Sequence, residues 1–330
     1  MKPEELRVDP HVHCRGEDWS YKSTIAEVQD IAERQGVCAI FDMPNNNPLT
    51  LNADDVRRRL ALVNHNSSVE YYTYVGLTND VDQIVCAANC WHMFPQVAGL
   101  KMFAGRSVGT MSVVEEKDQL TVYHTLQGLD YRGVVATHCE KEAWLDPKLW
   151  DPKLPISHSL ARPKVAEIKS VKDQIGFATE AGFKGILHIC HVSCPESVDL
   201  VIRARLAGKI RITCGVTPHH LLYSTEKQAE QLMLGNFLKV NPPLRTEADR
   251  LLLMQYLIEG HIDWIETDHA PHSMGEKLGS PYMSGIPSLH LYNDLLKVIQ
   301  PDISNSRMRD LTFGNIFKAF SPKLNHLLKK

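Results

Sequence analysis

The feature of this chain that most constrains its fold is a regular alternation of short apolar runs with amphipathic stretches. Eight runs have the length and composition of β-strands, at residues 6–13, 37–44, 69–77, 97–103, 133–139, 185–192, 210–217 and 262–268. Helix-like stretches lie between them, at residues 24–35, 53–63, 81–90, 167–181, 197–206 and 248–259. Several of these stretches are followed by glycine, the residue expected just past a helix C-terminus. Eight strands alternating with helices over roughly 250 residues predict an α/β protein, a (β/α)8 TIM barrel.

A doubly wound open sheet is the alternative fold for such a pattern. No Gly-x-Gly-x-x-Gly segment follows the first strand, which argues against that sheet. Polar residues of chemical interest stand at or just beyond the ends of strands one, two, four, five, six and eight. In a barrel these ends converge on one face, where active sites are built. We therefore interpret residues 1–330 as a single barrel with a C-terminal helical extension at residues 311–330, and residues 103–114 and 144–163 as loops over its mouth.

The bulk composition excludes several classes of protein. The chain has 36 basic and 39 acidic residues, a net charge of −3, so no basic surface for nucleic acid is indicated. No apolar stretch approaches the roughly 20 residues of a membrane span, and the first residues lack the apolar segment of a signal peptide. The 8 cysteines are scattered, several of them within apolar runs, which favours reduced thiols in a cytoplasmic protein.

The chemistry-bearing residues at the strand ends are those of a metal site. His11 and His13 are two apart on a strand, so their imidazoles point to the same face. His138, His191 and Asp268 end other apolar runs. Each histidine alone would be interpreted as an ordinary buried residue. Four imidazoles and a carboxylate converging on one face instead predict a metal site, and nitrogen and oxygen ligands suit zinc.

Two of the candidates allow more than one interpretation. Lys101 interrupts an apolar strand, where an unpaired ammonium is costly. It could form a salt bridge or lie at the barrel rim; as a neutral amine it could instead react with CO2 to give a carbamate, an anion able to bridge two metal ions. Asp268 could cap the next element, or it could bind a metal and accept the proton of the attacking water.

Seven segments between residue 9 and about residue 290 match the motifs of one enzyme family, in the family's order. They are Asp9-Pro10-His11-Val12-His13-Cys14-Arg15, Met43-Pro44-Asn45-Asn46-Asn47-Pro48, Gly99-Leu100-Lys101, His188-Ile189-Cys190-His191-Val192-Ser193, Val216-Thr217-Pro218-His219-His220-Leu221, Lys239-Val240-Asn241-Pro242-Pro243-Leu244, and Thr267-Asp268-His269-Ala270-Pro271-His272 with Glu276-Lys277. With these segments the chain resembles the dihydroorotases, in the cyclic amidohydrolase branch of the amidohydrolase superfamily.

The resemblance implies a binuclear site with two zinc ions per subunit. One ion would be held by His11, His13 and Asp268 and the other by His138 and His191, with N6-carboxylated Lys101 bridging them. Asp268 would also be the catalytic residue. The implied substrate-binding residues are Arg15, Asn45, Asn241 and His272, with the backbone near Ser284 and Gly285. A guanidinium suits a substrate carboxylate because it offers paired donors.

The implied activity is the reversible, zinc-dependent cyclisation of N-carbamoyl-L-aspartate to dihydroorotate in pyrimidine synthesis. The alternatives are another cyclic amidohydrolase, such as a hydantoinase or allantoinase, and a non-catalytic scaffold for aspartate transcarbamoylase. Hydantoins need not carry the carboxylate that Arg15 would bind, and scaffold relatives typically lose metal ligands, whereas all six positions are present here. The resemblance leaves room for a homodimer and for association with aspartate transcarbamoylase.

The chain departs from the family pattern at three places. Gly215 stands where many relatives carry an acidic residue, and Ser288 and His290 replace residues of a Gly-x-Pro-Gly-x-Glu-like segment. The first change is expected to alter an auxiliary metal or polar contact, and the second the packing behind the substrate loop. The small β-sandwich that flanks the barrel in many relatives is expected to be absent.

Overall fold

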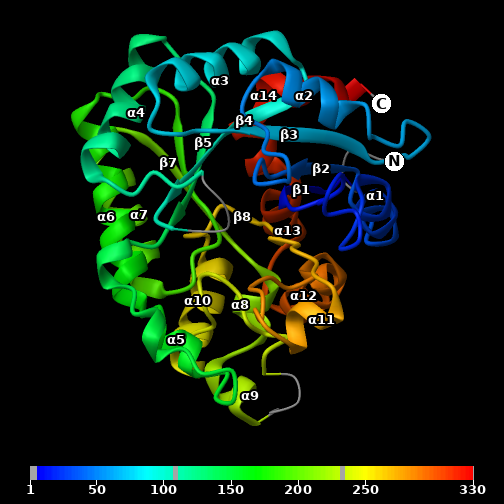
Figure 1. Ribbon diagram of the computed structural model, residues 1–330, viewed down its shortest axis with the longest axis vertical. Coiled ribbons are helices and arrows are strands. Elements are labelled where there is room, and N and C mark those ends of the chain that lie inside the picture. Colours follow the sequence, from blue (N-terminus) through cyan, green and yellow to red (C-terminus); the bar gives the residue numbers. More distant parts are fainter. Residues whose placement is uncertain (1–5, 107–110, 231–234, 330) are drawn as a thin grey trace.

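A computed structural model describes residues 6–106, 111–230 and 235–329 of the chain (Figure 1). Its eight strands form one parallel sheet in sequence order. The strands are β1 (Val8–Val12), β2 (Ala39–Asp42), β3 (Glu70–Gly76), β4 (Val97–Ala104), β5 (Val134–Cys139), β6 (Ile186–Ile189), β7 (Arg211–Val216) and β8 (Trp264–Ile265). A parallel bridge between Val12 and His269 joins the first strand to the segment after the last one, so the sheet curls into a nearly closed barrel. The predicted (β/α)8 barrel is confirmed.

The helices that cover the barrel begin and end where their capping residues dictate. Six correspond to the predicted ones: α1 (Ile25–Arg34), α2 (Ala53–Leu60), α3 (Val81–Met93), α6 (Lys164–Glu180), α7 (Pro195–Ala207) and α10 (Glu247–Glu259). Thr24 and Asn52 each start a helix with a capping box, and Gly208 and Gly260 end helices at φ angles of 64° and 93°. Helix α4 (Glu116–Gly128), between β4 and β5, was not among the predicted helices.

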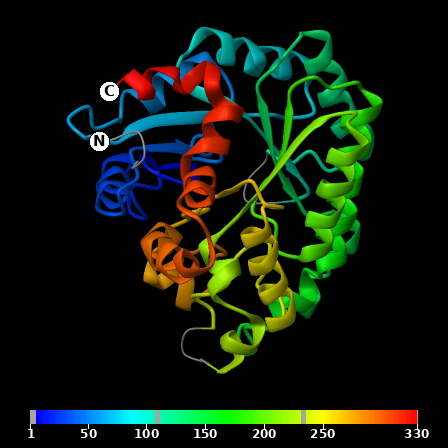
Figure 2. The same cartoon turned by 180° about the vertical axis from the view of Figure 1, so that it is seen from behind.

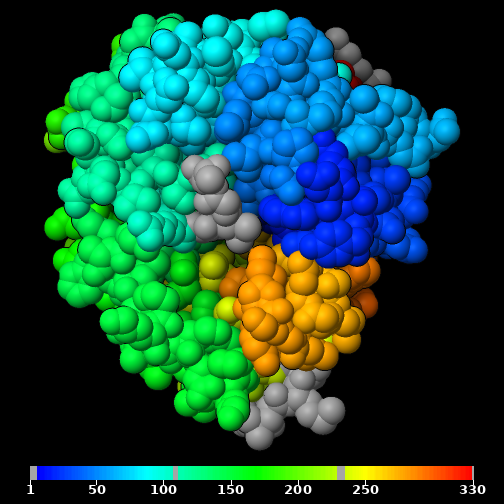
Figure 3. Space-filling model, in the orientation of Figure 1, coloured from blue at the N-terminus to red at the C-terminus, as the bar shows by residue number. Residues whose placement is uncertain are grey.

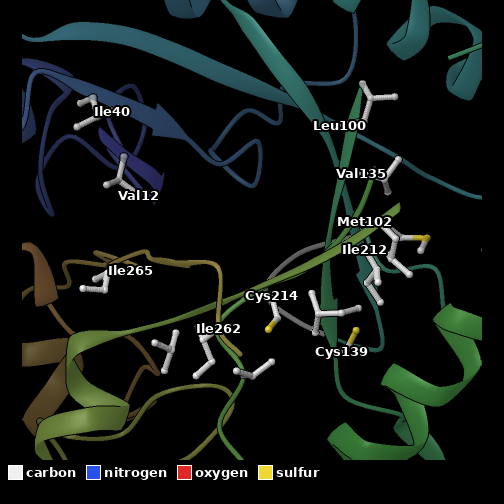
Figure 4. Close-up of a cluster of buried hydrophobic side chains, with 14 of the residues drawn as sticks. Val12, Ile40, Leu100, Met102, Val135, Cys139, Ile212, Cys214, Ile262 and Ile265 are labelled. Atoms are coloured by element: carbon white, nitrogen blue, oxygen red, sulfur yellow. The ribbon is translucent and has the colours of Figure 1, made fainter. Parts of the chain in front are cut away.

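Apolar side chains form two layers, because successive residues of a strand point to opposite faces. In β4 and β5, Leu100, Met102 and Val135 point outward into the larger cluster, against the surrounding helices (Figure 4). Ala136, next to Val135, belongs to the second cluster, with the aromatic residues Phe41, Tyr74 and Trp264. The same alternation turns Lys101 and His138 to the inner side of the barrel, so the strand period places the site residues there.

The C-terminal helices pack against the barrel (Figure 2). They are α12 (Tyr292–Ile299), α13 (Asn305–Arg309) and α14 (Asn315–Leu324). The Phe320 ring lies 5.0 Å from the Phe41 ring and 6.1 Å from the Trp264 ring, which ties α14 to the inner cluster. The predicted single helix at residues 311–330 is interrupted, since a π-turn precedes α14 and the chain kinks at Phe320, two residues before Pro322.

The segments predicted as loops at the barrel mouth are partly helical. Residues 144–163 contain a short 3-10 turn at Pro147–Leu149 and the helix α5 (Ser157–Ala161). Residues 107–110 of the other segment lie outside the described residues. The remaining short helices are α8 (Pro218–Leu222), α9 (Thr225–Glu230) and α11 (Met274–Leu278). Within the part of the chain that the structure describes, none of the helices has the length and apolarity needed to cross a membrane.

Candidate metal centre and substrate pocket

A pocket of about 460 Å³, open to solvent, lies at the carboxyl ends of the barrel strands. In Figure 3 the surface is hollowed where the green, yellow and orange segments meet. Ten of the twelve residues predicted for the site line this pocket; the other two, Lys101 and His272, lie against it. The lining consists of His11, His13, Arg15, Asn45, Phe103, His138, His191, Val240, Asn241, Asp268, Ala270, Ser284 and Gly285.

The side chain of Asp268 joins two of the predicted metal ligands. Its Oδ1 lies 2.9 Å from Nε2 of His13 and 3.3 Å from Nε2 of His11. All three side chains are almost completely buried, and their ligand atoms lie within 4.8 Å of one another. Asp268 therefore faces two imidazoles across the pocket and does not cap a following helix, the alternative that the sequence had left open.

The other predicted ligands form a second contact beside this one. Nδ1 of His138 lies 3.2 Å from Nε2 of His191. The His191 ring also lies 5.1 Å from the His11 ring, so the four imidazoles form one continuous group. Strands β1, β5 and β6 each end here, which explains why residues far apart in the sequence meet.

The protonation states of this group suit metal binding. Burial lowers the pKa of His13 to about 4, and burial together with the charge of His138 lowers the pKa of His191. Burial would raise the pKa of Asp268, but the hydrogen bonds and charges of His11 and His13 hold it well below its usual range. Burial opposes protonation of His11, but the Asp268 carboxylate beside it raises the pKa of His11 well above its usual value, so zinc binding there would release a proton. Neutral His13 and His191 and an ionised Asp268 are forms that bind zinc, and the nitrogen and oxygen donors fit the predicted metal.

Lys101 lies beneath the pocket and is completely buried. Its Nζ is 3.1 Å from Sγ of Cys190 and 4.9 Å from the centre of the Phe103 ring. Among the described residues no carboxylate lies within ion-pair distance of this nitrogen, so Lys101 does not form the salt bridge considered above. Because the side chain is completely buried, it does not lie at the barrel rim either. Burial opposes ionisation of Cys190, but Lys101 beside it lowers the pKa of that thiol to about 5.

Three of the predicted site residues have a left-handed backbone. Arg15, His191 and Asp268 have φ angles of 59°, 36° and 48°. Such conformations cost of order 1–3 kcal/mol for residues other than glycine and persist only where neighbouring groups impose them. The Arg15 carbonyl accepts a hydrogen bond of 2.6 Å from Nη1 of Arg59, and the His191 N–H donates one of 2.5 Å to Oε1 of Glu266.

The predicted substrate-binding residues lie on the outer side of the same pocket. Nη2 of Arg15 is 3.1 Å from Nε2 of His272, which is itself 3.1 Å from the Ser284 carbonyl oxygen. Oδ1 of Asn45 is buried and has no hydrogen-bond partner among the residues that the structure describes, and Asn241 also faces the pocket. A guanidinium and an amide here form a place for an anionic, amide-containing ligand beside the imidazoles.

Further charged residues, which were not among the predicted site residues, contact the candidate ligands and their neighbours from behind. Oε2 of Glu140 lies 3.0 Å from Nε2 of His138 and accepts a hydrogen bond of 2.6 Å from Nη2 of Arg162. Oε2 of Glu266 lies 2.9 Å from Nε2 of His188. The signal for Glu266 was present, since like Lys101 it is a charged residue in an apolar strand run.

The departures from the family pattern occupy definite places. The Ser288 hydroxyl donates a hydrogen bond to the Thr267 carbonyl oxygen at 2.5 Å, so it supports the segment that carries Asp268. The His290 ring lies 6.0 Å from the His269 ring. Gly215 on β7 faces the carboxylate of Glu266.

Comparisons with known proteins find relatives of this chain both by sequence and by fold. No protein-family model matches the chain. The dihydroorotase of Halobacterium salinarum is 31% identical over 318 residues, which cover 95% of this chain and 71% of that protein. The dihydroorotase of Aeropyrum pernix is 33% identical over 295 residues, which cover 86% of this chain and 61% of that protein.

Solved structures of low sequence identity share the fold. An L-hydantoinase from Arthrobacter aurescens matches with a TM-score of 0.85 at 21% identity, over 96% of this chain and 70% of its own. A D-hydantoinase from Thermus sp. matches with a TM-score of 0.79 at 20% identity, over 95% of this chain and 70% of its own.

Proposed function

The chain belongs to the dihydroorotase family of metal-dependent cyclic amide hydrolases, and we propose that it interconverts N-carbamoyl-L-aspartate and dihydroorotate in pyrimidine synthesis. One observation carries this choice of substrate. The Arg15 guanidinium and the Asn45 amide open into the same pocket as four imidazoles and Asp268. A fixed cation beside a hydrolytic centre suits a cyclic amide that bears a carboxylate, as dihydroorotate does.

Two zinc ions per subunit are part of the proposal. His11, His13 and Asp268 would hold one, and His138 and His191 the other. The proposal is supported by the four imidazoles and the carboxylate that meet at the pocket, with lowered pKa values for His13, His191 and Asp268. When bound, zinc supplies a Lewis acid for the ring carbonyl oxygen and makes water more acidic.

We propose further that Lys101 is carboxylated. Its neutral Nζ would form a bond to the carbon of CO2 and release a proton, which leaves a carbamate anion. The support is that Nζ is completely buried beside the imidazole group and, among the described residues, has no carboxylate in ion-pair contact. Carboxylation would replace a buried cation that, among the described residues, lacks a carboxylate partner by an anion able to serve both metal sites.

Asp268 is proposed to move the proton. In hydrolysis the ring C–N bond breaks, and the leaving nitrogen needs the proton that the attacking water loses. The Asp268 carboxylate borders the pocket, and its lowered pKa keeps it ionised, the form that can take the proton from the attacking water and pass it to the leaving nitrogen. In the synthetic direction it takes the proton from the attacking nitrogen and passes it to the departing oxygen, while Arg15 and Asn45 hold the substrate.

A hydantoinase activity is the second candidate, because the solved structures that match in fold include hydantoinases. A spectrophotometric assay of dihydroorotate hydrolysis, with hydantoin and allantoin as comparators, separates the two. We expect turnover of dihydroorotate in preference to both comparators. Turnover of hydantoin or allantoin without dihydroorotate would refute the proposed substrate, and no turnover by the zinc-loaded protein would favour the scaffold alternative. The same proposal includes a cytoplasmic location for the protein, a homodimer, and association with aspartate transcarbamoylase.

A further inference from the structure

Glu266 is a completely buried carboxylate directly beneath the proposed metal site. It is the residue immediately after β8. Its Oε1 accepts the His191 N–H at 2.5 Å and lies 3.6 Å from Nδ1 of His11. Its Oε2 accepts a hydrogen bond of 3.0 Å from Nε1 of Trp264 and lies 2.9 Å from Nε2 of His188. The carboxylate thus touches two proposed ligands on the side away from the pocket.

One contact is a hydrogen bond to the backbone of His191, and the other is a charged approach to the ring of His11, longer than a hydrogen bond. A histidine that binds a metal through one ring nitrogen is usually held through the other by a carboxylate, carbonyl or water. Oε1 of Glu266 is the carboxylate oxygen in ion-pair range of Nδ1 of His11, whose Nε2 faces Asp268. The hydrogen bond to the His191 N–H holds that residue at its φ of 36°, a conformation unfavourable for a side chain with a Cβ.

Residue 215 on the neighbouring strand shares this space. Gly215 pairs with Trp264 in the register of β7 and β8. A Cβ added at Gly215 would lie 2.5 Å from Cδ of Glu266, and 2.7 Å and 2.9 Å from its Oε2 and Oε1. No side chain larger than hydrogen fits at residue 215 while the Glu266 carboxylate occupies its present place.

One of these distances, the one to Cδ, is the distance found within a glutamate side chain. Within a glutamate side chain, two C–C bonds of about 1.5 Å separate Cβ from Cδ, which puts these atoms about 2.5 Å apart. That is the distance between the added Cβ at residue 215 and Cδ of Glu266. A glutamate at residue 215 could therefore place its carboxylate in the volume that the Glu266 carboxylate now fills.

We propose that Glu266 is a positioning residue for His11 and His191, and that residues 215 and 266 are two interchangeable points of attachment for one carboxylate. The assignment of His11 and His191 as ligands rests on the proposed function. The proposal explains the Gly215 departure, because the acidic group expected at that strand end comes here from β8.

The test is a cycle of full-length variants: Glu266→Ala, Gly215→Glu and the two changes together. Zinc affinity is measured by competition with a chelator, and ligand geometry by the visible spectrum of the cobalt-loaded protein. We expect Glu266→Ala to weaken zinc binding about 10–100-fold and to shift the cobalt spectrum. Gly215→Glu alone should also weaken binding, since two carboxylates meet in one volume. The double variant should recover most of the affinity and the wild-type spectrum.

A matched control removes a nearby acidic side chain without contact to a proposed ligand. Asp263 precedes β8 and accepts the Cys214 N–H at 2.7 Å. Asp263→Ala should change the unfolding temperature and leave zinc affinity within about twofold of wild type. This control separates a general loss of strand stability from loss of ligand orientation.

Three outcomes would overturn the proposal. Wild-type zinc affinity and cobalt spectrum in Glu266→Ala would show that Glu266 positions nothing. A folded double variant no better than Glu266→Ala would refute the exchange of attachment points. If the double variant does not fold, the Glu266→Gln variant provides the test instead. Glutamine keeps the shape of the side chain but removes its charge, so a wild-type zinc affinity in Glu266→Gln would count against the proposal. These measurements need no substrate. The variants can therefore confirm the role of Glu266 even if the wild-type protein does not hydrolyse dihydroorotate, and they can refute that role even if the wild-type protein is active.

Discussion

The buried ion pair between Arg59 and Asp42 supports the backbone of the proposed substrate site. Both side chains are completely buried, with Nη2 of Arg59 2.6 Å from Oδ2 of Asp42. Asp42 also accepts hydrogen bonds of 2.7 Å from the Tyr71 hydroxyl and 2.8 Å from the Cys14 N–H. Nη1 of Arg59 donates to the Arg15 carbonyl oxygen, which stabilises the left-handed backbone there.

Replacing Arg59 by methionine should be strongly destabilising. The change keeps an apolar stem but leaves the Asp42 carboxylate buried without its counter-ion, a loss of about 3–5 kcal/mol in the free energy of unfolding. With an unfolding entropy of roughly 2.1 cal/mol/K per residue, the 330 residues give about 0.7 kcal/mol/K. The unfolding temperature should therefore fall by roughly 4–7 °C. The KM for dihydroorotate should rise as well, because the Arg15 backbone loses a hydrogen bond.

Thermal and urea unfolding should be measured for Arg59→Met and for a control, Arg57→Met, to compare their losses in the free energy of unfolding. Arg57 lies on the same helix, but its pair with Asp54 is exposed, with 58% and 91% of the two side chains accessible. Such a pair contributes about 0–1 kcal/mol. If Arg59→Met were within about 1 kcal/mol of Arg57→Met, the buried pair would not stabilise the fold, and the reasoning would be wrong.

Four further outcomes follow from the proposed site. Lys101→Ala should lose most activity and one equivalent of zinc by metal analysis, with partial rescue by short-chain carboxylates; full activity would contradict a bridging role. Asp268→Asn should lower kcat about 10²–10⁴-fold in both directions, and a near-wild-type kcat with metal bound would transfer the proton role to His272. Arg15→Lys should mainly raise KM, because lysine does not reproduce the paired contact; an effect confined to kcat would count against carboxylate binding. Removal of zinc by a chelator should lower the unfolding temperature by roughly 4 °C for each zinc ion lost, relative to protein with free zinc at 100 times its Kd, and re-addition should restore it.

The pattern of residues along the chain was enough to predict the barrel and most of the pocket lining. The two-residue period of strands and the longer period of helices are local properties, so eight alternations were visible without any contact information. Parallel strands in a barrel end on one face. For that reason residues after different strands, such as His11, His138 and Asp268, could be predicted to meet.

The contacts that hold these residues in place could not be predicted before the fold was known. The Glu140–Arg162 pair behind His138 and the Arg59 support of Arg15 join segments that no local pattern relates. The shared volume of Gly215 and Glu266 depends on the distance between two neighbouring strands, a quantity absent from either segment alone. The sequence carries the period of each element, whereas complementarity between side chains of separate elements exists only once the chain has folded.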